Sequence, residues 1–340
     1  MYEQVYGFTE RPFQLTPDAR YWFESRTHKK AMAYLGYGLA QGEGFIVVTG
    51  EIGAGKSTLV AHLMATIDRE RLNAISLVST QVEGDDMLRL AAQGLGLETG
   101  GVMKAQLLDR IEQRLREEAS RGKRTLLVVD EAQNLPVSAL EELRMLSNFT
   151  SQGRALIQIF LLGQPEFRDR VASDDSLEQL RQRIIASHHL EPMDAHEVEP
   201  YAVHRLAVAG WRGRPAFEPD AFAALYRHAG GVPRKLNQLA SRLLLYAGVE
   251  QLESIAGADV DSVAADMAAD RPASASKRVL PLRRPAAAAG SEPAADPSLE
   301  RRIAAIEARI DEQEAAVRRV LTVLLDWVEN ESQPRRSNAA

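Results

Sequence analysis

The chain has 340 residues, a length that excludes one small domain and predicts about two domains. Its 41 Lys and Arg residues against 47 Asp and Glu residues give a formal net charge of -6, so no chain-wide attraction draws it to nucleic acid. Cysteine is absent from the sequence, which excludes disulfides, cysteine zinc sites and cysteine nucleophiles.

The first residues, Met1-Tyr2-Glu3-Gln4, lack the basic start and the apolar stretch of a secretory signal. No apolar run approaches the roughly 18 residues of a membrane-spanning helix. We therefore expect a cytoplasmic protein.

Short apolar runs and longer helix-like segments alternate in the first half of the chain. The runs are rich in Val, Ile and Leu without polar alternation, at residues 45–49, 74–78, 125–129 and 156–162. The helix-like segments include residues 28–41 and 103–119. This rhythm is typical of strands covered by helices on both faces. We predict an α/β core over residues 1–189, with a mainly parallel sheet and ligands at the carboxyl ends of its strands.

Beyond the core, the strand-like runs stop and helix-like segments dominate, at residues 195–209, 219–228 and 234–248. We predict a small helical lid domain over residues 190–270. The next segment, residues 271–297, holds five of the 15 prolines among Ala and Ser, so we predict a disordered linker there.

Apolar residues recur at spacings of four and three after the linker: Leu299, Ile303, Ile306, Ile310, Val317, Val320, Leu324 and Trp327. This heptad pattern favours a coiled-coil helix over residues 298–330 that mediates self-association. A single amphipathic helix docked on the body is the alternative. Residues 331–340 are predicted to be a disordered tail.

A glycine-rich loop lies between the first apolar run and a helix-like segment. It reads Gly50-Glu51-Ile52-Gly53-Ala54-Gly55-Lys56-Ser57, followed by Thr58. The pattern and its context between a strand and a helix are those of a phosphate-binding loop, in which backbone amides surround the phosphates. Lys56 would neutralise the β and γ oxygens of ATP, and Ser57 would coordinate Mg²⁺.

Two acids end the strand predicted at residues 125–129. Asp130 would hold Mg²⁺ together with Ser57, and Glu131 would polarise the water that attacks the γ-phosphate. Gln164, which follows the strand at residues 156–162, is a candidate sensor of the γ-phosphate, with a plain turn residue as the alternative.

Three arginines are candidates for the cation that neutralises the negative charge developing on the phosphate during hydrolysis. Arg183 is the first choice and Arg181 the second for a side chain that reaches the site of a neighbouring subunit; solvated surface charges are the alternative. Arg234 is expected in the first turn of a helix, where a cation opposes the helix dipole. This indicates an anion nearby, with ordinary surface placement as the alternative.

Together these residues resemble the AAA+ ATPases over residues 1–268, with Walker A at 50–57, Walker B at 126–131, sensor 1 at Gln164, an arginine finger at Arg183 and sensor 2 at Arg234. The resemblance implies a P-loop NTPase fold of the AAA+ type. The stretches 6–8, 11–13, 16–18, 28–55, 130–135, 163–166 and 231–234 are more narrowly similar to the ExeA/GspA group of secretion ATPases. Within that group, the chain resembles most the secretion ATPase of exosortase (PEP-CTERM) and exopolysaccharide gene clusters.

The resemblance implies an ATPase that uses ATP and Mg²⁺, forms a homo-oligomeric ring and acts with a protein partner of an envelope secretion or polysaccharide-export system. A DNA-binding ATPase of the MuB or TniB type, acting in transposition, is the alternative, but basic residues are dispersed among acids. A scaffold that binds nucleotide without hydrolysing it is a third alternative. The basic cluster of Lys277, Arg278, Arg283 and Arg284 would allow peripheral contact with the inner membrane, or would be solvated.

Overall fold

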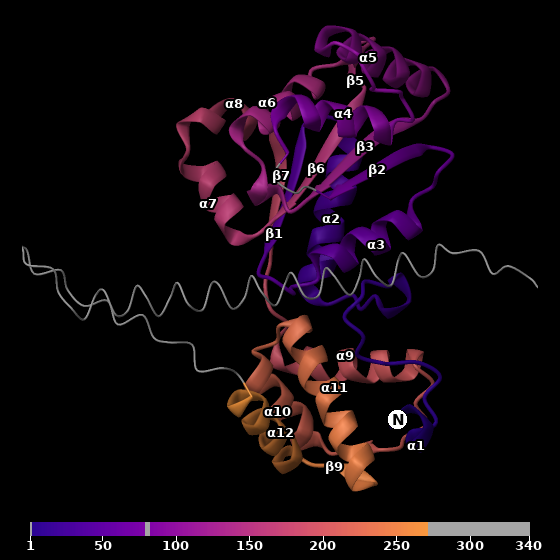
Figure 1. The fold of residues 1–340 in the computed structure, drawn as a ribbon, viewed down its shortest axis with the longest axis vertical. Coiled ribbons are helices and arrows are strands. Elements are labelled where there is room, and N and C mark those ends of the chain that lie inside the picture. The colour runs from indigo at the N-terminus through magenta and orange to yellow at the C-terminus, as the bar shows by residue number, and fades with distance from the viewer. Residues whose placement is uncertain (1, 79–81, 271–340) are drawn as a thin grey trace, which may run out of the picture. The chain divides into compact units, whose positions relative to one another are not determined.

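The computed structural model describes residues 2–78 and 82–270. A five-stranded sheet in the order β2-β3-β6-β1-β7 forms its centre, and every neighbouring pair is parallel (Figure 1). Its strands are β1 (Phe45–Gly50), β2 (Leu72–Val78), β3 (Arg124–Asp130), β6 (Ile157–Gly163) and β7 (Ile184–Leu190). The predicted parallel sheet is confirmed.

Helices cover both faces of this sheet, because its inner strands are apolar on both sides. Alternate residues of β3 show this: Leu127 and Val129 pack in one apolar cluster, whereas Leu126 and Val128 pack in the other. The first cluster is covered by α4 (Gly84–Gly94), α5 (Lys104–Ser120), α6 (Val137–Leu146), α7 (Pro165–Ser173) and α8 (Glu178–Arg181). The second is covered by α2 (Arg26–Gln41) and α3 (Lys56–Thr66).

Short elements connect these layers. They are the 3-10 turns η1 (Ala19–Tyr21), η2 (Ala132–Asn134) and η3 (Asp175–Leu177), and the antiparallel pair β4 (Thr150–Ser151) and β5 (Arg154–Ala155).

The strand register brings the carboxyl ends of three central strands to one edge. Thr49 pairs with Gly163, and Val129 pairs with Leu161. The loop after β1, the acids after β3 and the turn after β6 therefore lie together, where a parallel sheet binds ligands.

A second group of helices encloses its own apolar cluster. Its elements are α9 (Ala195–Val208), β8 (Ala216–Phe217), α10 (Pro219–Ala229), α11 (Pro233–Glu250), β9 (Ser254–Ile255) and α12 (Gly257–Ala269). These elements lie within residues 190–270, and the cluster they enclose is called the lid cluster below. The start of the chain also belongs to this cluster, because Tyr2 of α1 (Tyr2–Tyr6), Phe8 and Phe13 pack in it. This segment, which falls within the range 1–189 predicted as the core, supplies aromatic rings to the lid cluster.

Strand β7 is the strand of the central sheet that the sequence did not reveal. Its polar residues Ser187, His188 and His189 interrupt the apolar pattern that marks the other strands. They are tolerated because β7 is an edge strand, with only β1 beside it.

Among the described residues, no helix combines the length and apolarity that a bilayer crossing requires. The linker predicted at 271–297, the coiled coil at 298–330 and the tail at 331–340 lie outside the described residues.

Candidate active site

The loop between β1 and α3 follows a path that only glycine allows at two positions. A Cβ atom on Gly53 would lie 2.3 Å from Cβ of Arg234, and one on Gly55 would lie 2.6 Å from Nε2 of His28. Both glycines have positive φ angles, +86° and +99°. Residues with side chains would therefore disturb both the backbone and its contacts with α2 and α11.

Lys56 lies folded over this loop. Its side chain is buried, and Nζ donates hydrogen bonds to the carbonyl oxygens of Gly50 at 2.7 Å and Glu51 at 3.1 Å. Burial lowers the pKa of Lys56, and the carboxylates of Glu131 and Asp130 oppose this shift. Phosphate oxygens would compete well for these donors, because hydrogen bonds between ions are stronger than those to neutral carbonyls.

The two predicted magnesium ligands are in contact. Oγ of Ser57 donates a hydrogen bond to Oδ2 of Asp130 at 3.2 Å. A hydroxyl and a carboxylate are the hard oxygen donors that fit Mg²⁺, which usually keeps waters and binds substrate phosphates as well.

Glu131 is oriented by two amide side chains and by an unusual backbone conformation. Its φ angle is +56°, and its N–H donates to Oδ1 of Asp130 at 2.9 Å. Its Oε2 accepts hydrogen bonds from Nε2 of Gln133 and, at 3.3 Å, from Nε2 of Gln164. Oε1 of Gln133 also accepts the backbone N–H of Gln164 at 3.0 Å. The carboxylate is therefore held at the edge of the sheet, where backbone strain often marks function.

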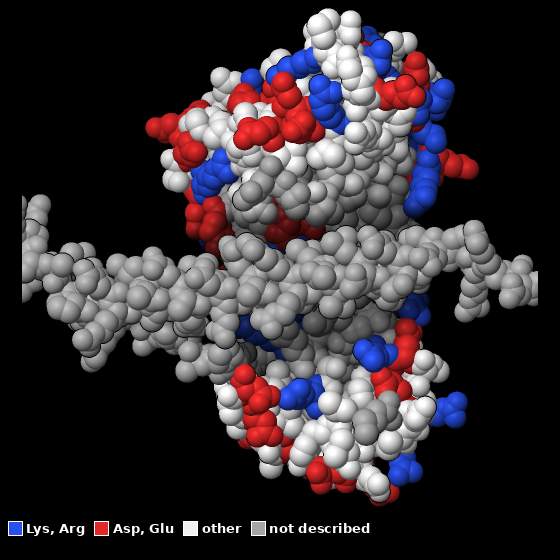
Figure 2. All heavy atoms as spheres, in the orientation of Figure 1, with Lys and Arg blue, Asp and Glu red and all other residues white. Residues whose placement is uncertain are grey.

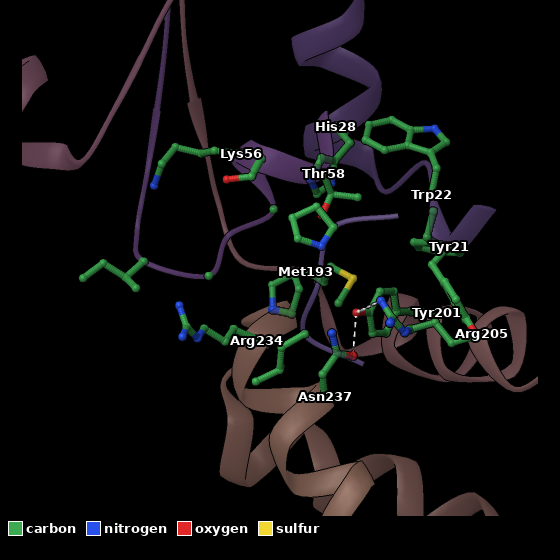
Figure 3. A pocket seen from close by; sticks show the side chains of 18 of the residues that line it. Tyr21, Trp22, His28, Lys56, Thr58, Met193, Tyr201, Arg205, Arg234 and Asn237 are labelled. Atoms are coloured by element: carbon green, nitrogen blue, oxygen red, sulfur yellow. Dashed lines mark hydrogen bonds between the residues drawn. The ribbon is translucent and has the colours of Figure 1, made fainter. Parts of the chain in front are cut away.

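Arg234 joins the lid to the phosphate loop. It lies in the first turn of α11, and its backbone N–H donates to the carbonyl of Gly53 at 3.1 Å. A cavity of about 360 Å³ is lined by Arg234 together with Lys56, Glu131 and Gln164. Figure 3 shows Arg234 and Lys56 among the side chains that line it. Other predicted loop residues that line it are Ile52, Gly53, Gly55, Ser57 and Thr58. Ala54 is buried within the loop.

Arg183 lies at the opposite edge of the sheet from this cavity. It directly precedes β7, and its carbonyl accepts the N–H of Phe45 at the start of β1. Its Nη1 donates one hydrogen bond, to Oγ of Ser147 at 3.1 Å. Arg183 therefore lies at the amino ends of the strands, whereas the cavity of its own chain lies at their carboxyl ends.

Arg181 makes more contacts within its own chain. Its Nε and Nη2 donate to the carbonyls of Val171 at 2.8 Å and Asp174 at 3.0 Å. Its Nη1 forms an ion pair with Glu178 at 2.6 Å. These contacts tie Arg181 to the turn that precedes α8.

An aromatic group that sequence reasoning did not identify supports the loop. Nδ1 of the buried His28 lies 2.7 Å from Oγ of Ser25, which caps α2. The Trp22 ring meets the His28 ring edge-on at 5.1 Å and stacks on the His62 ring of α3 at 4.2 Å. Trp22 thus links the amino-terminal segment to both helices beside the phosphate loop.

His28 predicts a pH dependence of stability. Burial lowers its pKa from 6.5 to about 4, although Glu197 opposes the shift. Below pH 6.5 the unfolded chain binds a proton at this ring that the folded chain binds only near pH 4. We expect this group to remove about 3 kcal/mol from the free energy of unfolding over that range as the pH falls.

The measurement is urea unfolding of wild type and His28→Gln between pH 7 and pH 4.5. Burial also lowers the pKa of other histidines, namely His62, His188, His189 and His204. The contribution of His28 is therefore the difference between wild type and His28→Gln in how steeply the free energy of unfolding changes with pH. His196→Gln, at an exposed position, is the matched control and should keep the wild-type slope. Equal slopes for wild type and His28→Gln would contradict the expectation.

The far end of the cavity is formed by residues that the sequence analysis did not select. Tyr21 and Trp22 come from the amino-terminal segment, Met193 from the connection to α9, and Tyr201 and Asn237 from the lid. Phe8 and Phe13, from the same amino-terminal segment, are buried in the lid cluster. Asn237 stands three residues after Arg234, a helical spacing that was the one available signal for it.

Comparison with known proteins agrees with this geometry. Residues 39–171 match the family model described as an AAA domain. General secretion pathway protein A of Aeromonas hydrophila is 35% identical over 272 residues, which cover 80% of this chain and 49% of that protein. The chain therefore spans about half the length of this relative.

Solved structures share the fold at much lower identity. Cdc6p of Pyrobaculum aerophilum is 15% identical with a TM-score of 0.59, over 75% of this chain and 70% of that chain. The ORC2 protein of Aeropyrum pernix, in ADPNP-ADP complexes, is 15% identical with a TM-score of 0.56, over 76% of this chain and 71% of that chain.

The AAA-domain match agrees with the parallel P-loop sheet and with the site, where Lys56, Ser57 and Glu131 line one cavity and Asp130 accepts a hydrogen bond from Ser57. Residues 39–171 are therefore an AAA domain built on a P-loop sheet, and the chain is similar to general secretion pathway protein A over about half of that protein's length.

Proposed function

We propose that this ATPase forms a homo-oligomer with nucleotide sites between its subunits, and that ATP binding and hydrolysis drive assembly of a bacterial envelope secretion or exopolysaccharide-export system. The observation that carries the proposal is the separation of two required groups. Glu131 lines the cavity, whereas Arg183 lies at the opposite edge of the same sheet. A complete site then needs Arg183 from a second copy.

Within one subunit, each residue has a separate part in hydrolysis. Lys56 leaves the carbonyls of Gly50 and Glu51 to bind the β- and γ-phosphates. Ser57 and Asp130 would hold Mg²⁺, which supplies positive charge to the phosphate oxygens when it is bound.

Glu131 is the general base of the proposed mechanism. To polarise a water beside the γ-phosphate, its carboxylate must exchange at least one of its bonds to Gln133 and Gln164. Gln164 then senses the γ-phosphate, because movement of its amide frees Glu131. Arg234 contacts the γ-phosphate from the lid and connects nucleotide state to lid position.

The choice of Arg183 over Arg181 is supported by their contacts. Arg183 donates one side-chain hydrogen bond within the described residues, to a serine hydroxyl. Arg181 donates to two carbonyls and pairs with Glu178. Arg183 therefore loses less when its guanidinium turns toward a phosphate of another subunit.

The proposed role in secretion is supported by the 35% identity to general secretion pathway protein A. The assignment to an exosortase (PEP-CTERM) and exopolysaccharide system extends this role through the motif resemblance. We place the protein in the cytoplasm, with peripheral contact at the inner membrane through its protein partner or its basic linker cluster.

A DNA-binding role of the MuB or TniB type has less support. On the face shown in Figure 2, acidic and basic side chains alternate over the described residues, whereas DNA tracking needs a continuous basic strip.

The proposal is tested by measuring particle mass and phosphate release on the same samples, with and without ATP. We expect ATP to increase particle mass, and phosphate release per subunit to rise with protein concentration because Arg183 acts between copies. A variant that ends at Asp270 shows how much residues 271–340 contribute to self-association. Phosphate release that is independent of concentration, from a particle that stays monomeric, would contradict the proposal.

A further inference from the structure

We propose that Asn237 reads the base of the bound nucleotide by donating one hydrogen bond from its side-chain amide to a purine ring nitrogen. This inference rests on the proposed function, because it assigns a task to the end of the same cavity that lies away from the phosphate loop. It makes Asn237 a specificity-determining residue.

The side chain of Asn237 is buried and belongs to the cavity. Asn237 is 6% exposed and lines the cavity from α11. Figure 3 shows its amide beside Tyr201, on the same helix as Arg234. A buried amide needs partners for both its oxygen and its nitrogen.

A hydroxyl fixes which atom of this amide accepts a hydrogen bond and which is left to donate. The Tyr201 hydroxyl lies 2.8 Å from Oδ1 of Asn237 and 3.4 Å from Nη1 of Arg205. A guanidinium can only donate, so the Tyr201 oxygen accepts from Arg205 and its single proton goes to Asn237. The amide oxygen is therefore the acceptor, and Nδ2 is left as a donor.

Arg205 is itself held firmly, which makes the orientation of the amide stable. Its side chain is buried, and Nε and Nη2 donate to the carbonyls of Pro12 at 2.7 Å and Gln14 at 2.9 Å. Its guanidinium also lies over the Tyr21 ring, 4.5 Å from the ring centroid. The amino-terminal segment thus orients Asn237 through Arg205 and Tyr201.

The surroundings of Asn237 suit a planar apolar ring. Tyr21, Trp22 and Met193 line the cavity with Asn237, and Figure 3 shows Lys56 on the other side of it. Aromatic and thioether side chains pack well against a base, and a small number of oriented polar groups gives such a pocket its specificity. Adenine offers acceptor nitrogens at its ring edges, which match the Nδ2 amide donor of Asn237.

The test compares ADP with its 1-deaza, 3-deaza and 7-deaza analogues by calorimetry on the full chain. Each analogue replaces one ring nitrogen with a carbon. On wild type, we expect one of the three analogues to bind about tenfold more weakly than ADP, because a buried donor loses its acceptor. On Asn237→Ala, ADP should bind about tenfold more weakly, and that same analogue should lose nothing further.

Two further variants complete the test, one that removes the amide donor and one that serves as a control. Asn237→Asp preserves the shape and the bond from Tyr201 but replaces the donor with an oxygen, so ADP should lose more affinity than with Asn237→Ala. Gln238→Ala, exposed on the next position of α11, is the matched control and should keep the wild-type pattern. Melting temperatures of all variants establish that they are folded.

The outcomes distinguish this inference from the function on which it rests. If wild type binds ADP and the effects of Asn237→Ala and of every analogue simply add, base reading by Asn237 is wrong and the proposed function stands. Weakening by 2′-deoxy-ADP alone would likewise overturn it, because the amide would then bind the ribose. Absence of ADP binding by wild type would overturn the proposed function itself.

Discussion

Replacing Arg183 with alanine is expected to lower ATP turnover by about a thousandfold or more while leaving ATP affinity nearly unchanged. The guanidinium would neutralise charge that develops only as the γ-phosphate leaves, so its loss affects the transition state and not the bound ground state. Its position before β7, at the amino edge of the sheet, keeps it away from the cavity of its own chain. Phosphate release and calorimetric ATP binding on the same variant are the measurements.

Mixing provides the control for action between subunits. Arg183→Ala keeps its own Glu131, and Glu131→Gln keeps its own Arg183. A mixture of these two inactive proteins should regain a fraction of wild-type turnover, because some sites in mixed oligomers combine both intact residues. Arg181→Ala should retain most activity, since Arg181 is bonded within its own chain. Normal turnover by Arg183→Ala alone would disprove this assignment.

Glu131→Gln is the second large effect, with turnover expected to fall by about a hundredfold to ten-thousandfold. The substitution preserves the shape of the side chain and removes the carboxylate that accepts from Gln133 and Gln164. ATP should still bind, because Lys56 and the phosphate loop are untouched. Single-turnover phosphate release and ATP binding would be compared with wild type.

A control substitution tests whether replacing any acid near this edge of the sheet lowers turnover. Glu166→Gln changes another acid just after β6 without altering the predicted base, and should keep wild-type turnover. Wild-type turnover by Glu131→Gln would show that another group activates the water. Equally negligible turnover by wild type and variant would favour the scaffold alternative.

The sequence predicted the parts of the fold and site whose signals are local. Continuous apolar runs identified β1, β2, β3 and β6, and the glycine pattern identified the loop from Gly50 to Ser57. The register of these strands explains why Asp130, predicted from its place after a strand, lies against Ser57.

The remaining features depend on contacts between distant segments. Strand β7 is polar because it is an edge, and no local pattern shows that Ile184 pairs with Phe45. Arg205 is buried because its charge is satisfied by the carbonyls of Pro12 and Gln14, which lie 193 and 191 residues away in the sequence. Such partners become visible only in the folded protein, and the base end of the cavity is built from them.

Gln133, which donates a hydrogen bond to Glu131, lies between these two cases: the residue was visible in the sequence, but its contact was not. Gln133 lies two residues further along, so its presence was plain in the sequence. Its role depends on the positive φ angle of Glu131 and on the turn at η2, which bring its amide back to the carboxylate. Positive φ at a non-glycine residue is not readable from residue type.

The central claim is that backbone amides of the loop and the ammonium group of Lys56 hold the phosphates of ATP. Calorimetric titration of wild type and Lys56→Ala with ATP and Mg²⁺ tests it most directly. We predict a clear binding heat for wild type and at least about a hundredfold weaker binding for Lys56→Ala, because a buried ammonium that meets several phosphate oxygens is removed. Identical titrations of the two proteins, with or without heat, would contradict the account.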